Sequence, residues 1–144
     1  MTISKALFSS NNQEWGTPQF LFHTLTRTEG PFKLDAATTE DNPLGTPYFY
    51  TKKDNALEKR WRNPTFCNPP YGRDVWKWVC KAYLESIAGN KVVMLLPARV
   101  GTRWFHKWIW QRPKVDWYPL QGRLKFQGAT NSAPFDSMVV IFRP

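Results

Sequence analysis

The residues best suited to chemistry are Asn68, Pro69, Pro70 and Tyr71, which follow one another directly. An amino group attached to a heteroaromatic ring is a poor nucleophile, because its lone pair is delocalised into the ring. Two acceptors aimed at its N–H groups would draw the nitrogen toward tetrahedral geometry. Asn68 offers a side-chain oxygen, and the diproline turn offers a carbonyl that the fixed φ of proline holds in place. The tetrapeptide therefore predicts methylation of an exocyclic amino group.

Tyr71 adds a flat aromatic face to this motif. A base turned out of its helix could stack on that face, which contributes roughly 1–3 kcal/mol per base. The alternative is that the tetrapeptide is only a turn, since Asn-Pro and Pro-Pro are common turn dipeptides and the chain has 12 prolines.

The elements around the motif favour the catalytic interpretation. Residues 65–67 form a short β-prone run, and residues 74–88 show helical spacing of their apolar side chains. The motif therefore lies at the carboxyl end of a predicted strand and just before a helix, which is where open α/β sheets bind ligands.

The rest of the chain alternates between strand and helix patterns. A helix is predicted over residues 18–26, with Thr17 as its N-cap and Pro18 at its first position. Other predicted elements are strands at 32–35, 48–50, 92–96 and 115–118, a turn or helical connector at 54–61, and a Thr102-capped helix containing residues 104–109. Residues 124–126 and 138–142 are predicted to pair antiparallel, joined by the polar loop 127–134. This pattern predicts one three-layer α/β domain over residues 1–144, with residues 1–14 loose.

The charge of the chain favours a polyanionic partner. The 144 residues contain 20 Lys and Arg against 11 Asp and Glu, a formal charge of +9. Residues 91–144 carry 9 basic and 2 acidic side chains, whereas residues 1–90 carry 11 and 9. Such an excess attracts phosphate backbones and makes binding depend on salt. The alternative is a basic face that only keeps the protein soluble.

Metal and membrane sites are not indicated. Cys67 and Cys80 form no CxxC pair, and His23 and His106 are isolated, so no metal is expected. Cys67 is best explained as a small buried residue in a reducing compartment. No apolar run approaches the roughly 20 residues that span a bilayer. These features predict a soluble, cytoplasmic protein.

Seven short motifs, in this order along the chain, carry a family resemblance. They are Trp15-Gly16-Thr17-Pro18, Leu34-Asp35-Ala36-Ala37, Asp54-Asn55-Ala56-Leu57 with Trp61, Asn68-Pro69-Pro70-Tyr71, Leu96-Pro97-Ala98-Arg99, Gly122-Arg123-Leu124-Lys125-Phe126 and Ala133-Pro134-Phe135-Asp136-Ser137. The set resembles the phage-type DNA N-6-adenine methyltransferases. That resemblance implies a Rossmann-like methyltransferase sheet, mostly parallel with an antiparallel C-terminal hairpin. It also implies S-adenosylmethionine as methyl donor, adenine in DNA as acceptor, and work in the host cytoplasm.

The resemblance also implies residue roles. The catalytic residues would be Asn68 to Tyr71. Those that bind the cofactor would be Thr17, Pro18, Asp35, Ala36 and Asp54. Asp35 would meet the methionine ammonium or the ribose, although a turn cap is the alternative, and helix capping explains Thr17 and Pro18 equally well. No GxG turn follows Asp35, so the small side chain of Ala36 must let the ligand approach the backbone.

DNA contact is predicted for Arg99, Arg103, Arg123 and Lys125, because they lie in the basic third and flank the strand ends. Arg123 is the best candidate, although each of the four could be only a solvated charge. The target adenine of a duplex would have to be flipped out to react by direct in-line methyl transfer. Base readout would come from loops such as 127–134.

Other activities fit the same motif. The acceptor could be cytosine in DNA, guanine in RNA or a protein glutamine, and the basic charge argues only against the last. A noncatalytic nucleic-acid-binding domain of the same fold is a further alternative, which the missing glycines keep open.

Overall fold

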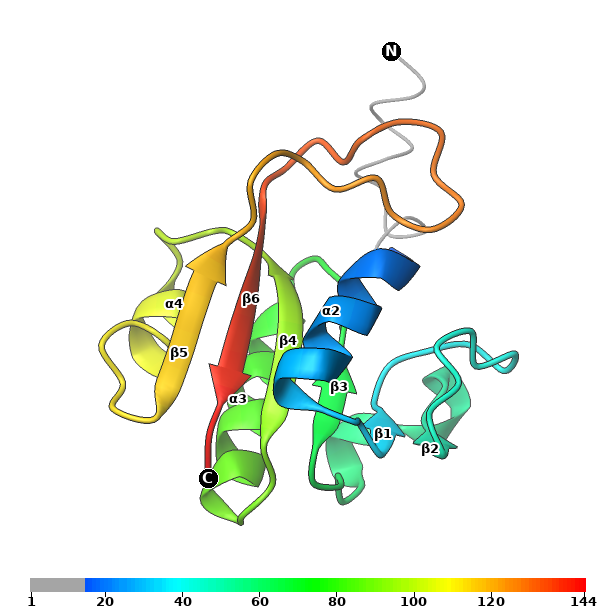
Figure 1. Ribbon diagram of the computed structural model, residues 1–144. Coiled ribbons are helices and arrows are strands. Elements are labelled where there is room, and N and C mark those ends of the chain that lie inside the picture. The colour runs from blue at the N-terminus through cyan, green and yellow to red at the C-terminus, as the bar shows by residue number, and fades with distance from the viewer. Residues whose placement is uncertain (1–14) are drawn as a thin grey trace.

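The computed structural model describes residues 15–144, which fold around a six-stranded sheet in the order β2-β1-β3-β4-β6-β5 (Figure 1). The strands are β1 (Leu34–Asp35), β2 (Tyr48–Phe49), β3 (Thr65–Cys67), β4 (Val92–Pro97), β5 (Val115–Pro119) and β6 (Ser137–Phe142). The first four strands are parallel, and β6 is antiparallel to both β4 and β5. The predicted Rossmann-like α/β class is therefore confirmed. The expectation that residues 1–14 are loose lies outside the described residues.

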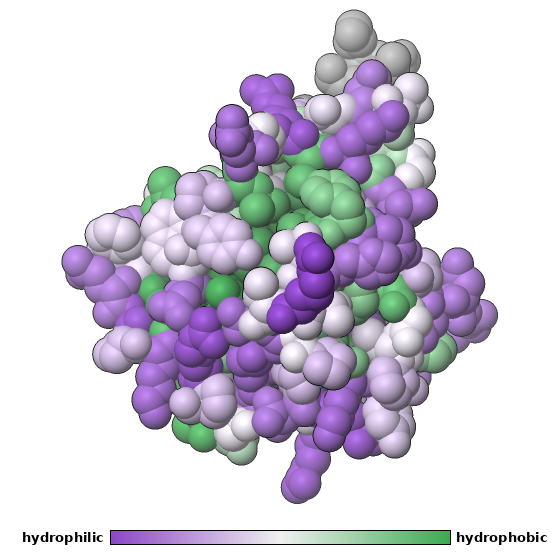
Figure 2. All heavy atoms as spheres, viewed as in Figure 1, coloured by the Kyte–Doolittle hydropathy of each residue, from purple (hydrophilic) through white to green (hydrophobic). Residues whose placement is uncertain are grey.

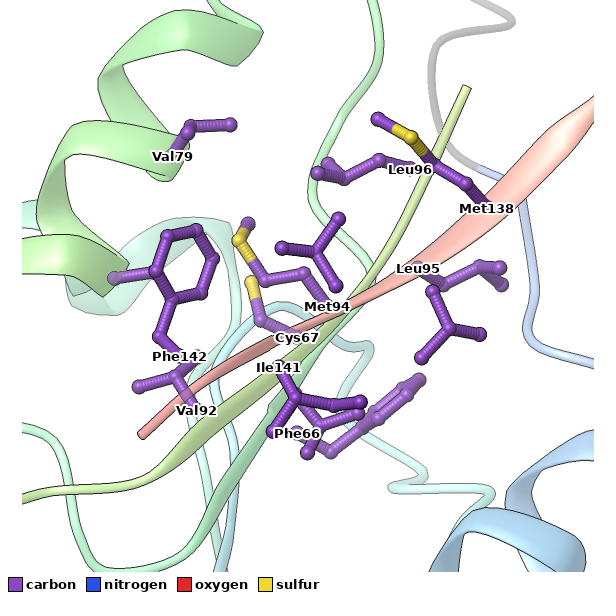
Figure 3. Close-up of a cluster of buried hydrophobic side chains, with 14 of the residues drawn as sticks. Phe66, Cys67, Val79, Val92, Met94, Leu95, Leu96, Met138, Ile141 and Phe142 are labelled. Carbon is purple, nitrogen blue, oxygen red and sulfur yellow. The ribbon is translucent and has the colours of Figure 1, made fainter. Parts of the chain in front are cut away.

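The centre of the sheet is apolar on both faces. All six residues of β4 and all six of β6 are buried, as expected for strands covered on both sides. Figure 3 shows their side chains meeting Phe66 and Cys67 from β3 and Val79 from a neighbouring helix. This core holds the ends of β3 and β4 rigidly in place.

Helices form the two outer layers (Figure 1). Helix α2 (Gln19–Glu29) covers one face, and its Phe22 ring meets the ring of Phe66 edge-on at 5.3 Å between centroids. Helices α3 (Val75–Ile87) and α4 (Arg103–Trp108) cover the opposite face. No helix within residues 15–144 combines the length and hydrophobicity that crossing a bilayer requires.

Parallel pairing brings the loops that follow β1, β3 and β5 to the same end of the sheet, the end where these strands have their carboxyl termini. Strands β1, β3 and β4 run in the same direction, and β5 shares it because β6 is antiparallel to both β4 and β5. The loop 120–136, between β5 and β6, therefore begins and ends at the edge where β1 and β3 end. Figure 1 shows this loop arching over that edge toward the start of α2.

Most predicted elements are confirmed, with short connections between them. The helix predicted at 74–88 is Val75–Ile87, the strand predicted at 92–96 is Val92–Pro97, and the Thr102 hydroxyl accepts a hydrogen bond from the Phe105 N–H. The connector predicted at 54–61 consists of two 3-10 turns, Lys52–Asp54 and Ala56–Glu58.

Two local predictions are wrong. Thr17 does not cap α2, because Pro18 occupies the N-cap position and no side chain caps the helix, which also continues three residues beyond Thr26. Residues 124–126 form no strand, and β6 pairs instead with β4 and β5. The antiparallel C-terminal strand was predicted correctly, but its partner was not.

The opposite end of the central strands, away from the loop 120–136, is held by a partly buried carboxylate. Glu29, at the end of α2, accepts hydrogen bonds from Lys91 Nζ at 3.0 Å and from Arg143 Nη1 at 3.0 Å, and its side chain is only 15% exposed. Burial by itself would raise the pKa of Glu29. The hydrogen bonds and charges of Arg143 and Lys91 outweigh burial, so the pKa is lowered.

We predict that Glu29→Gln lowers the free energy of unfolding at pH 7 by roughly 1–2 kcal/mol, because two charged partners lose their acceptor. Since the folded-state pKa of Glu29 is lowered, its contribution is present above the unfolded pKa and disappears as pH falls through the folded one. The difference between variant and wild type should therefore shrink on acidification, as urea unfolding at several pH values would measure.

The matched control is Glu40→Gln. Glu40 forms an ion pair with Lys53 on the protein surface. The Glu40 side chain is 72% exposed and the Lys53 side chain is 84% exposed. Exposed pairs contribute little, so this variant should unfold like the wild type. Equal destabilisation by both substitutions would contradict a special role for Glu29.

Candidate active site

A cavity of about 400 Å³ lies at the carboxyl ends of β1 and β3. It is bounded by Trp15 to Thr17, Asp35 to Thr39, Pro43 and Leu44, Thr51 and Lys52, Asn55 to Leu57, Asn68, Pro70, Trp78 and Gln127. Five predicted site residues thus share one cavity, namely Thr17, Asp35, Ala36, Asn68 and Pro70. This is the edge where open α/β sheets bind ligands, and the volume falls in the range of about 300–1,000 Å³ typical of ligand pockets.

The amide of Asn68 is held in one orientation. Its Nδ2 atom donates to the main-chain carbonyl of Trp15 and to Thr17 Oγ1, the latter at 3.0 Å. Because a carbonyl oxygen can only accept, the atom facing Trp15 must be the nitrogen. Asn68 Oδ1 is buried and has no hydrogen-bond partner among residues 15–144. Asn68 lines the cavity, so this unpaired acceptor lies beside the space that a ligand would occupy.

The diproline turn supplies further acceptors beside this oxygen. Pro70 lines the cavity, whereas Pro69 is buried and does not. The carbonyl oxygens of Pro69 and Pro70 take no part in the backbone hydrogen bonds that hold the loops and turns of residues 15–144. These two carbonyl oxygens therefore have no backbone partner among the loops and turns of residues 15–144.

Tyr71 is buried rather than displayed, with 4% of its surface exposed. Burial raises the pKa of the Tyr71 phenol well above its usual value, so the hydroxyl stays protonated and donates to the carbonyl of Leu95 at 3.0 Å. Its ring meets the rings of Phe126 and Phe135 edge-on, at 6.3 and 5.6 Å between centroids. Because these neighbours cover Tyr71, a base could stack on it only after they move.

An aromatic cluster ties the loop 120–136 to the chain before α2. Trp15 lies 5.3 Å from Phe126 and 5.5 Å from Phe135, measured between ring centroids. The Gln127 N–H also donates to the Gly16 carbonyl at 2.8 Å. A Cβ on residue 16 would lie 3.0 Å from the Gln127 Cβ, so this close approach favours glycine.

Asp35 places a carboxyl group on the cavity wall. It is buried at the end of β1, where burial raises its pKa to about 7, although bonds from the Ala37 N–H and the Thr38 side chain favour the charged form. The Ala37 bond is 3.4 Å long, so Asp35 also caps the turn that follows, as the alternative interpretation expected. A partly protonated carboxyl in an apolar cavity is suited to meet a cationic group.

Two predicted cofactor residues do not reach the cavity. Pro18 is buried at the start of α2. Asp54 accepts hydrogen bonds from the Thr51 N–H at 2.7 Å and the Thr51 hydroxyl at 3.2 Å, and the first of these belongs to a capping box. Its neighbours Lys52 and Asn55 line the cavity instead.

Small residues take the place of the missing glycine-rich turn. Ala36 and Ala37 follow β1 directly, and both line the cavity. The Ala36 N–H donates to the carbonyl of Phe66 at 3.0 Å, which continues the pairing of β1 with β3. Short side chains therefore bring the backbone to the cavity surface without a GxG sequence.

The four predicted DNA-contact residues are exposed at the same edge as the cavity. Arg99 follows β4, Arg103 begins α4, and Arg123 and Lys125 lie in the loop 120–136. None of them forms an ion pair with another described residue. Figure 2 shows hydrophilic side chains projecting from the upper end of the molecule, where Figure 1 places this loop.

The predictions missed much of the apolar wall. Leu44, Leu57 and Trp78 line the cavity although none was predicted as a site residue. Leu57 belongs to a motif that carried the family resemblance, which is a signal that could have identified it. Leu44 and Trp78 lie in a loop and a helix that reach the cavity only through tertiary packing. No group of three or more His, Cys, Asp or Glu side chains within residues 15–144 is arranged to hold a metal ion.

Comparison with known proteins gives consistent matches. The family described as DNA N-6-adenine-methyltransferase (Dam) matches residues 4–144. The chain is 32% identical over 136 residues to a DNA N-6-adenine-methyltransferase of Escherichia phage T1, an alignment covering 83% of this chain and 56% of that protein. It is 30% identical over 144 residues to one of Haemophilus phage HP1, covering 94% and 81%. The chain thus spans about half the length of the phage T1 relative.

A solved structure of a human methyltransferase 10 domain containing protein also aligns with this chain. The alignment has a TM-score of 0.48 and 10% sequence identity, and covers 86% of this chain and 79% of the other.

We predict that Asp35→Asn stabilises the protein in the absence of ligand, increasingly as pH rises from 5 to 8. The folded-state pKa of Asp35 is raised from 3.8 to about 7, so the folded state is progressively destabilised as pH rises between these values. An asparagine cannot ionise and removes this dependence. Thermal unfolding of both proteins across this pH range would test it, and parallel curves would show that Asp35 has no raised pKa.

Proposed function

The chain belongs to the DNA N-6-adenine-methyltransferase (Dam) family, and we propose that it transfers a methyl group from S-adenosylmethionine to the N6 amino group of adenine in DNA. One observation carries this proposal: Asn68 lines the cavity, and its Oδ1 is a buried acceptor without a partner in residues 15–144. An adenine amino group offers the N–H donor that this oxygen lacks.

The cavity fits the methyl donor. Leu44, Leu57 and Trp78 give it apolar walls, while Asp35 supplies a carboxylate for the ammonium or the ribose hydroxyls of S-adenosylmethionine. Ala36 lets the backbone approach the ligand, and Thr17 lines the side nearest Asn68. When bound, the cofactor supplies an electrophilic methyl group on a positively charged sulfur.

The chain's own part in the reaction is to hold the acceptor nitrogen. Asn68 Oδ1 accepts one N–H of the amino group, and a carbonyl of the diproline turn accepts the other. These bonds pull the nitrogen toward tetrahedral geometry and direct its lone pair at the methyl carbon for direct in-line transfer. Such positioning can supply on the order of 7–11 kcal/mol of the barrier reduction, without a metal or a covalent intermediate.

An adenine in duplex DNA must leave the stack to reach this oxygen, at a cost of a few kcal/mol. Stacking on Tyr71 offsets part of this cost, and it requires the loop 120–136 to withdraw Phe126 and Phe135 from that ring. We therefore propose that the loop shifts when DNA binds. This shift would expose the Tyr71 ring, which the free protein keeps buried.

The exposed cations around the cavity hold the DNA backbone. Arg99, Arg103, Arg123 and Lys125 lie at the edge of the sheet where the target base must enter. Neutralising phosphates there releases counterions, so affinity falls as salt rises. Sequence preference arises from the loop 120–136, which carries two of these cations beside the cavity-lining Gln127.

Mass spectrometry of nucleosides after incubation with DNA and S-adenosylmethionine tests the activity directly. We expect N6-methyldeoxyadenosine from DNA treated with the wild type and none from DNA treated with Asn68→Ala. The variant should still bind S-adenosylmethionine in calorimetry. The substitution removes the acceptor oxygen but leaves the carboxylate and apolar walls of the cavity in place. Methylcytosine, methylation of RNA only, or no cofactor heat would each favour one of the other activities and overturn this one.

We predict that Arg123→Ala weakens DNA binding about equally for all sequences and reduces the salt slope of log affinity by roughly one, as expected for one lost phosphate contact. Fluorescence anisotropy at several salt concentrations would measure both. Lys114→Ala makes the same charge change immediately before β5, at the opposite edge of the sheet, and should leave the slope unchanged. An equal effect of the two substitutions would indicate only a general charge effect.

A further inference from the structure

The side chain that bonds the Asn68 amide is Thr17, which lies 51 positions earlier in the chain. Thr17 Oγ1 accepts from Asn68 Nδ2 at 3.0 Å, and both residues are buried. The second acceptor is the main-chain carbonyl of Trp15. Since an amide nitrogen carries two N–H groups, the two acceptors use its full donor capacity.

The orientation of this amide decides what a base would meet. With Nδ2 held, Oδ1 is the atom left unpaired. A flipped amide would place Oδ1 against the Trp15 carbonyl and would put N–H groups where Oδ1 now lies. A donor facing the N–H groups of adenine cannot activate them, so the flipped amide would be inactive.

We propose that Thr17 is a positioning residue, which acts through Asn68 to keep its oxygen turned toward the target amino group. The inference rests on the proposed function and goes beyond it, because Thr17 then contributes to turnover and not only to the wall of the cofactor cavity.

The position of this clamp depends on the loop that faces DNA. Residue 16, between the two acceptors, is bonded through its carbonyl to the Gln127 N–H at 2.8 Å. The Trp15 ring packs on Phe126 and Phe135 of the same loop. The segment 15–17 therefore connects the loop 120–136 to the Asn68 amide, so a loop shift on DNA binding acts on the geometry of the reactive oxygen.

Two substitutions at position 17 separate positioning from other roles. Thr17→Val keeps the shape but removes the acceptor, and Thr17→Ser keeps the acceptor but removes a methyl group. We expect the methylation rate at saturating substrates to fall about 3- to 10-fold in the valine variant, the range for one lost hydrogen bond, and to return to within about twofold of wild type in the serine variant. The KM for S-adenosylmethionine and the Kd for DNA should change by less than about twofold in both.

Proton–nitrogen correlation NMR of the protein without ligands gives a second readout. The side-chain amide signals of Asn68, assigned by their loss in Asn68→Ala, should move in Thr17→Val and return toward the wild-type position in Thr17→Ser. If the Thr17 side chain served only packing, the Asn68 signals would not move in Thr17→Val, because valine preserves the packing.

Several outcomes would overturn the inference. These are a valine variant with full turnover, a valine effect confined to the KM for S-adenosylmethionine, Asn68 signals that do not respond, and a serine variant as impaired as the valine one. If the wild type itself does not methylate DNA while the Asn68 signals still respond to Thr17→Val, the proposed function fails and the hydrogen bond stands. The two failures are therefore distinguishable.

Discussion

The site depends on one buried amide that is bonded on its nitrogen and unpaired on its oxygen. Leaving a buried acceptor without a partner costs roughly 1–3 kcal/mol, and native proteins retain few such atoms. Asn68 Oδ1 carries this cost in the ligand-free fold, and a donor entering the cavity removes it. Because Trp15 and Thr17 already hold the amide, the oxygen need not reorient when the donor arrives. Fixed dipoles of this kind are how enzymes stabilise a developing charge distribution without reorganisation.

The sheet explains why this oxygen and a carboxyl group face the same cavity. Strands β1 and β3 are adjacent and parallel, with Asp35 opposite Phe66, so Asp35 and Asn68 emerge at one edge. Packing around this end of the sheet also buries both groups. Burial therefore has two effects there: it raises the pKa of Asp35 to about 7, and it leaves Asn68 Oδ1 without solvent. A cationic ligand would lower the pKa of Asp35 again, and an N–H donor would give Asn68 Oδ1 a hydrogen-bond partner.

Local patterns predicted the framework well, and long-range contacts explain what they missed. The continuous apolar run of β4, the helical spacing of α3 and the tetrapeptide beginning at Asn68 are all readable within a short window of sequence. Thr17 followed by proline reads equally well as a helix cap, and only the fold shows that its partner is Asn68. Leu44, Leu57 and Trp78 of the cavity wall belong to three separate segments, so no local period could bring them together.

The error at residues 124–126 has a physical cause that bears on function. Along this stretch buried and exposed side chains alternate, with Leu124 and Phe126 inside and Arg123, Lys125 and Gln127 outside. This is the period of a half-buried strand, and the sequence was interpreted accordingly. In the structure the inward side chains pack within the core and the aromatic cluster, without strand pairing. The loop thus has two sides: its exposed side chains are free to vary, while the buried ones anchor it over Tyr71 in the free protein.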